Sequence, residues 1–254
     1  MDTGTIIYII TMGWTLIIFG GLTYLIVKKK DYFLISGFYK RSEEEKVYLQ
    51  KSGYLNAMAK AMTISFWIFT LTFIVGLLPI PYGFEIGIGI FLIVLLGGMI
   101  WIQRYEVPYR RKRATWTTAI ISIVTLGFII AIFVVGYIDN EIKVNQDIFE
   151  ITGMYGLELD IDDIEHITLL DELPEVIMKT NGFATTNLLK GRFQLVEPYG
   201  TCTLFIQKRT NPVLYIQTKD DYVMIARKDA NETRVLHDLL IQEKNRLANN
   251  ESYE

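Results

Sequence analysis

The side chains that could carry acid–base or nucleophilic chemistry are few and lie far apart in the chain. His166 and His237 are the only histidines, and histidine is the side chain whose ordinary pKa lies nearest neutral pH. No serine or cysteine nucleophile motif accompanies either of them. The one cysteine, Cys202, allows no intrachain disulfide, cannot form a zinc site alone, and is expected to be buried and structural. We therefore predict that the protein is not an enzyme, and we assign no catalytic, cofactor-binding or metal-binding residue.

Carboxylates are densest in one short segment of the C-terminal half, where a cation could in principle be bound. The cluster consists of Asp160, Asp162, Asp163 and Glu165, and it is followed by Asp171, Glu172 and Glu175. Calcium prefers carboxylate oxygens, but the spacing is not that of an EF-hand loop and the required glycine is missing. We interpret the cluster as a solvated strand edge.

Charged residues beside the apolar runs are the other candidates. Glu85 is the one acidic residue near an apolar run, and its place next to Tyr82-Gly83 predicts a position at the membrane interface. The basic run Arg110-Arg111-Lys112-Arg113 could recruit anionic lipid, but a role in orienting the chain explains it more simply. There is no P-loop, dinucleotide fingerprint or HExxH motif in the chain.

The apolar residues of this chain gather in its first half. The hydrophobic fraction is 51% and the mean hydropathy is +0.28, both high for a soluble protein. Four apolar runs are long enough to cross a hydrocarbon core of about 30 Å, and we predict spans near residues 5–27, 58–78, 84–102 and 114–138. None carries a charge at its centre, which argues against an ion-coupled transporter or a proton relay.

The loops between these runs indicate an orientation. The stretches 28–57 and 103–113 hold twelve Lys and Arg residues, whereas the N-terminal tail and the turn at residues 79–83 hold none. Basic loops stay in the cytoplasm. The distribution predicts a multi-pass protein of the bacterial plasma membrane with both termini outside the cytoplasm.

Residues 139–248 have the pattern of a soluble α+β domain. Short alternating segments separated by turn signals, among them Asn181-Gly182, predict about seven antiparallel strands. Asp229 and Glu232 have capping-box spacing and open a C-terminal helix. We expect its apolar stripe to consist of Val235, Leu236, Leu239, Leu240 and Leu247. A sheet closed by one C-terminal helix is the pleckstrin-homology-like layout, and residues 249–254 are predicted to be a disordered tail.

The two halves differ in charge. Thirteen basic and seven acidic residues precede residue 139, whereas twelve basic and twenty-one acidic residues follow residue 138. A net charge of about −9 on the soluble half argues against nucleic acid and anionic lipid as its ligands. A protein or peptide partner at this domain is the expectation that remains.

One segment carries a family resemblance. Residues 34–46, LISGFYKRSEEEK, place an apolar-Gly-aromatic element before a Ser-x-Glu-Glu helix start. This resembles the signature of the domain-of-unknown-function 3784 family of bacterial membrane proteins, and the resemblance extends over about residues 5–102. The soluble half, with residues 169–174 and 180–184, looks like the bacterial pleckstrin-homology-type domain attached to such membrane regions. The resemblance implies no chemistry for particular residues.

Two hypotheses of function follow from these patterns. The first is a non-catalytic integral membrane protein with an extracytoplasmic interaction, sensing or immunity-type domain. It would contact the lipid bilayer through four spans and bind a protein or peptide partner, with a homo-oligomer left open. The alternative is a membrane enzyme or small transporter whose site forms between the helical bundle and the soluble domain.

Overall fold

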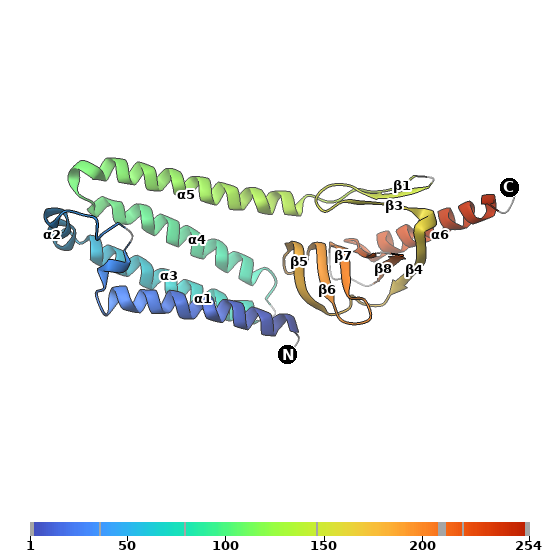
Figure 1. Cartoon of the computed structure of the whole chain (residues 1–254), viewed down its shortest axis with the longest axis horizontal. Coiled ribbons are helices and arrows are strands. Elements are labelled where there is room, and N and C mark those ends of the chain that lie inside the picture. Colours follow the sequence, from blue (N-terminus) through green and yellow to red (C-terminus); the bar gives the residue numbers. More distant parts are fainter. Residues whose placement is uncertain are drawn as a thin grey trace. The chain divides into compact units, whose positions relative to one another are not determined.

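The chain divides into two compact units within its last long apolar helix. A computed structural model describes residues 3–35, 37–78, 80–145, 147–207, 212–219 and 221–251. Residues 5–131 form a helical unit, and residues 132–254 belong to a unit built mainly of strands (Figure 1). The boundary falls inside a helix, so the last residues of that helix belong to the same unit as the sheets.

Four helices of the first half are long and apolar enough to cross a membrane. They are α1 (Thr3–Val27), α3 (Tyr54–Gly76), α4 (Gly83–Ile102) and α5 (Pro108–Tyr137). The four predicted spans are confirmed, and the protein is a multi-pass membrane protein. All four helices begin earlier than predicted, by one residue for α4, by two for α1, by four for α3 and by six for α5. Proline suits the first position of a helix because its missing N–H needs no partner there, which explains the start of α5 at Pro108.

The segment between α1 and α3 is folded. It contains the one-turn helix η1 (Tyr32–Leu34) and helix α2 (Glu43–Lys51). The Ser42 hydroxyl accepts from the Glu45 N–H, and the Glu45 carboxylate accepts from the Ser42 N–H, so the predicted capping box is confirmed. Ile35 and Phe38 pack with Leu49 in a small apolar cluster. The apolar part of the signature segment therefore packs on its own unit.

The second half contains two sheets. A three-stranded antiparallel sheet has the order β1-β2-β3, with β1 (Ile142–Asn145), β2 (Ile148–Ile151) and β3 (Leu157–Asp160). A six-stranded sheet has the order β4-β8-β9-β7-β6-β5. Its strands are β4 (Ile164–Leu170), β5 (Val176–Ala184), β6 (Leu189–Leu195), β7 (Thr201–Ile206), β8 (Val213–Thr218) and β9 (Tyr222–Ala226). Helix α6 (Ala230–Glu251) follows and contacts β4, β8 and β9.

The pleckstrin-homology-like layout of strands and one C-terminal helix is confirmed, with differences in detail. The described residues contain nine strands instead of about seven, and β7 pairs with β9 in parallel, so the sheet is not wholly antiparallel. The turn predicted at Asn181-Gly182 is wrong, because both residues lie inside β5. A Cβ on Gly182 would lie 2.4 Å from the Lys190 carbonyl oxygen, so this glycine serves a close approach of strands and not a turn.

The predicted helical stripe is partly wrong. Leu240 is fully buried against the sheet, and Leu236 and Leu247 pack beside it. Val235 is 65% exposed and Leu239 is 41% exposed. Positions 236, 240 and 247 follow the helical period, whereas Val235 and Leu239 each lie about 100° further round the axis. Helix α6 also continues to Glu251, beyond the predicted domain end at residue 248, and residues 252–254 lie outside the described part of the chain.

This difference gives a test with an internal control. Leu240→Ala should lower the free energy of unfolding of the sheet domain by about 2–5 kcal/mol, because it opens a cavity in the core. Leu239→Ala should lower it by about 1 kcal/mol or less, because this side chain is 41% exposed and lies outside the core cluster. Denaturant titrations of the isolated fragment 138–251, followed by circular dichroism, measure both. Equal losses for the two variants would show that α6 lies on the sheet by a different face.

Candidate functional site

The sequence candidates for acid–base chemistry do not come together. His166 is exposed on β4, and the Nδ1 atom of His237 lies 2.9 Å from Oδ1 of its neighbour Asp238. Cys202 is fully buried in β7, and this burial raises the pKa of its thiol far above the ordinary value, so the thiol is inert at neutral pH. The three residues lie on different elements and form no shared site.

The acidic cluster is exposed, as expected of a solvated edge. Asp162 and Asp163 lie in a single 3₁₀ turn, η3 (Ile161–Asp163), and Glu165 lies on the edge strand β4. Within the described residues no three His, Cys, Asp or Glu side chains are placed to share a metal ion. The cluster is therefore a charged rim of the domain.

The basic run next to the last span has a structural role. Arg110 and Arg111 lie in the first turns of α5, where Arg110 meets the buried carboxylate of Glu45 and Arg111 meets the backbone of Glu106. The Arg110 Nε atom lies 2.9 Å from a Glu45 oxygen, and Arg111 donates to the Glu106 carbonyl oxygen at 3.2 Å. Tyr109 also donates to Glu45, and this hydrogen bond lowers the pKa of Glu45 below its ordinary value of 4.5.

The second buried carboxylate completes this network. Glu106 is 2% exposed, forms an ion pair with Arg41 at 2.8 Å, and accepts from the Val107 N–H at 2.9 Å. A buried carboxylate without such partners would be costly. Residues of the signature segment and of the loop before α5 are thus joined by charge, which fixes the start of α5 in the helical unit.

The best-built arrangement in the other unit is the junction between the end of α5 and the sheets, which we define as residues 132–140 with the side chains that hold them. Phe183 of β5 lies against Gly136, where an added Cβ would come within 2.4 Å of its ring. The Phe183 ring also meets Phe133 and Tyr137 edge to face, with ring centroids at 5.9 and 5.7 Å. Only glycine at position 136 lets the phenylalanine insert between these two aromatic rings.

A buried lysine holds the next residue of the junction. Lys190 of β6 is 1% exposed, and its ammonium group donates to the Ile138 carbonyl oxygen just beyond α5. Burial lowers the pKa of Lys190, while the charge of Asp139 opposes this shift. A cation at this place also suits the negative end of the α5 helix dipole.

Two further residues bind the chain as it leaves the helix. Asp139 accepts from Gln207 at 3.1 Å and pairs with Lys228 at 2.5 Å, and the hydrogen bond from Lys228 lowers the pKa of Asp139. Asn140 is 4% exposed and donates to the carbonyl oxygens of Thr152 and Met154 at 2.6 and 3.0 Å. The segment from helix to first strand is therefore bound at successive residues and is not a free linker.

Sequence reasoning missed this site. From the sequence alone, the cations of the soluble half are scattered or paired and are outnumbered by acidic residues; they include Lys190, Arg192, Lys208, Arg209, Arg227 and Lys228. Lys190, Arg227 and Lys228 converge on residues 138–140, because β6 begins at the same end of the sheet where β9 ends. Lys208 and Arg209 lie outside the described residues. One signal in the sequence pointed to a buried lysine. Lys190 stands between Leu189 and Gly191 in a strand, and both of these neighbouring residues are buried.

The arrangement is held by aromatic packing, hydrogen bonds and ion pairs. Its cations and carboxylate are engaged with one another and with backbone carbonyls, as in a structural clamp. A displacement of β5 or β6 would act on the last turn of α5 through Phe183 and Lys190.

Comparisons with known families agree with this division of the chain. Residues 6–106 match the domain of unknown function DUF3784, and residues 140–235 match a bacterial PH domain. The predicted resemblance is thereby confirmed in both halves. No curated protein and no solved structure matches the chain. The second match begins at Asn140, where the junction passes into the sheet domain.

The lowered pKa of Lys190 predicts how stability depends on pH. Between that pKa and the ordinary lysine value of 10.5, the unfolded chain binds more protons than the folded domain. The free energy of unfolding should therefore rise with pH across this window and level off above it. Lys190→Met should abolish the rise, as measured by denaturant unfolding of the fragment 132–251, which keeps the whole junction, at a series of pH values.

A neighbouring lysine supplies the control for this test. Lys179 lies exposed on β5, so Lys179→Met should leave the pH dependence intact. A rise that persists in Lys190→Met would mean that another group causes it, and that Lys190 is not desolvated in solution.

Proposed function

Because the chain joins a DUF3784 membrane region to a bacterial PH domain, we propose that it is a non-catalytic interaction or sensing protein of the bacterial plasma membrane. Its sheet domain lies outside the cytoplasm and binds a protein or peptide, in a sensing or immunity-type role. The junction passes that binding event to α5. This proposal differs from an enzyme or a transporter because its output is a change in helix position.

The orientation is supported by charge. Twelve Lys and Arg residues occupy the stretches 28–57 and 103–113, and none occupies the turn at residues 79–83. The positive-inside rule places the two basic stretches in the cytoplasm. With four spans, the N-terminus and the sheet domain then lie on the other side.

The junction is the observation that carries the proposal. A ligand domain on a free tether can bind but cannot pull on its membrane helix. Here Phe183 packs on Gly136, Lys190 binds the Ile138 carbonyl oxygen, and Asn140 attaches the end of the segment to Thr152 and Met154. Binding energy at the sheets can thus bias the position of α5, provided that the ligand favours one arrangement of the junction over another.

The free edge of β5 is the ligand site that we favour. Among the described strands β5 pairs only with β6, so its other edge has backbone groups available to an added strand. Lys179, Thr180 and Asn181 are exposed along it. Phe183 lies on the same strand, so a peptide bound there would act next to the junction.

The orientation can be tested by cysteine labelling in intact cells. Single cysteines at Asp2 and Ser252 should react with a membrane-impermeant thiol reagent. A cysteine at Glu44, an exposed position of α2, should react only after the membrane is permeabilised. The native Cys202 is buried and should give little background. Labelling of Glu44→Cys alone in intact cells would reverse the topology and place the sheet domain in the cytoplasm.

The ligand class can be tested with liposomes. The fragment 138–251 should not float with vesicles of increasing phosphatidylglycerol content, because a net charge of about −9 on the soluble half is repelled by an anionic surface. A variant with Lys at Asp160, Asp162, Asp163 and Glu165 serves as the positive control, since these positions are exposed. Saturable, salt-sensitive flotation of the unmodified domain would make lipid binding its leading function.

A further inference from the structure

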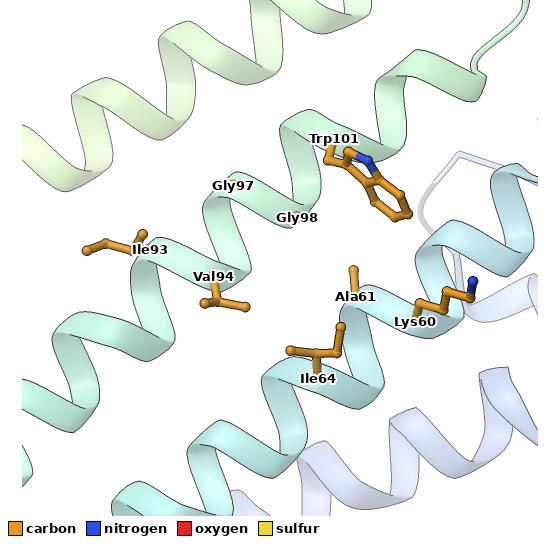
Figure 2. A pocket seen from close by; sticks show the side chains of 8 residues that line it. All are labelled: Lys60, Ala61, Ile64, Ile93, Val94, Gly97, Gly98 and Trp101. Atoms are coloured by element: carbon orange, nitrogen blue, oxygen red, sulfur yellow. The ribbon is translucent and has the colours of Figure 1, made fainter.

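A groove of about 420 Å³ runs between α3 and α4. Lys60, Ala61 and Ile64 line it from α3, and Val94, Gly97 and Trp101 line it from α4 (Figure 2). Apart from the lysine ammonium and the indole N–H, these side chains are apolar. The groove lies wholly within the helical unit.

The groove lies where α4 has two successive glycines, Gly97 and Gly98, in its C-terminal half. A Cβ added to Gly97 would have no other atom within 4 Å, so the space beside this residue is open. Toward one end of the groove, Val94 of α4 and Ile64 of α3 lie opposite each other, as Figure 2 shows. From Ile93 to Trp101 the groove follows α4 for about 12 Å at the usual helical rise.

The other end of the groove is polar. Lys60 and Trp101 lie there together, with the indole ring leaning from α4 toward α3 (Figure 2). Lys60 is exposed, and within the described part of the chain it has no ion-pair or hydrogen-bond partner. This end adjoins the two basic loops, because Lys60 is near the start of α3 and Trp101 is near the end of α4. Lysine and tryptophan at such positions mark the interface between hydrocarbon and headgroups.

An apolar channel with one unpaired cation at its interfacial end matches the two parts of a phospholipid. We propose that the groove binds an anionic phospholipid, with one acyl chain beside Gly97 and the phosphate at Lys60. A packed transmembrane helix fits less well, because it would cover Lys60 and bury its charge without a partner. The lipid neutralises this charge and fills the open space with hydrocarbon.

Trp101 provides a direct probe of this site. In a chain that keeps Trp101 as the only tryptophan, with Trp14, Trp67 and Trp116 changed to Phe, brominated acyl chains quench fluorescence from inside the groove. In mixed vesicles, brominated phosphatidylglycerol should compete for the site about fivefold better than brominated phosphatidylcholine. Lys60→Gln should remove this preference, and Gly97→Leu should reduce quenching by both lipids.

Matched variants separate the site from general effects. Lys51→Gln removes an exposed cation of α2, and Gly89→Leu adds the same side chain to α4 at a position outside the groove that is also open. Both should behave as the parent chain. Equal quenching by the two lipids, or a preference that survives Lys60→Gln, would overturn the proposal. Loss of an oligomer in Gly97→Leu, without lipid preference in the parent, would assign the groove to a second copy of the chain.

Discussion

The attachment of the sheet domain to its membrane helix depends on one buried cation. The Lys190 ammonium is removed from water and donates to the Ile138 carbonyl oxygen, and Asp139 stands nearby to oppose the cost of burial. The Asp139–Lys228 pair is half exposed and contributes about 1 kcal/mol or less. Lys190 and the Phe183–Gly136 contact therefore determine whether α5 and the sheets move as one body. The hydrogen bonds from Asn140 to the carbonyl oxygens of Thr152 and Met154 hold the chain where it enters the three-stranded sheet.

The same helix is held at its other end by a second charge network. The buried Glu45 carboxylate pairs with Tyr109 and Arg110 in the first turns of α5. The buried Glu106 carboxylate pairs with Arg41, and Arg111 of α5 donates to the Glu106 backbone carbonyl oxygen. Each network lies within its own unit. Helix α5 is thus the element that both units hold by buried charge, at its first turns and just beyond its last. The proposed function requires that a displacement of the last turn of α5 be carried along this helix.

Much of the fold could be predicted from the sequence, because hydrophobic runs and alternation report directly on membrane spans and strands. The capping box at Ser42 was equally local, and it was confirmed. The errors arose where tertiary contacts override a local pattern. Asn181-Gly182 has the composition of a turn but serves a close approach of β5 and β6. Leu239 was predicted to lie on the same helical stripe as Leu240, but it lies outside the row of side chains that packs on the sheet. The junction was missed because Lys190, Arg227 and Lys228 are brought together only by the order of the strands, which residue spacing does not encode.

A distance measurement across the junction tests the central claim most directly. Spin labels at Val135→Cys in the exposed face of α5 and at His166→Cys in β4 lie in the same unit, and Cys202 is buried and should remain unlabelled. The pair His166→Cys and Lys179→Cys, both in the six-stranded sheet, serves as the rigid reference. In the full chain in bilayers, the α5-to-sheet distance distribution should be as narrow as the reference, and Lys190→Met should broaden it. The account would be contradicted if, in the chain with native Lys190, the α5-to-sheet distance distribution were several times broader than the reference distribution. The sheet domain would then be freely tethered to α5.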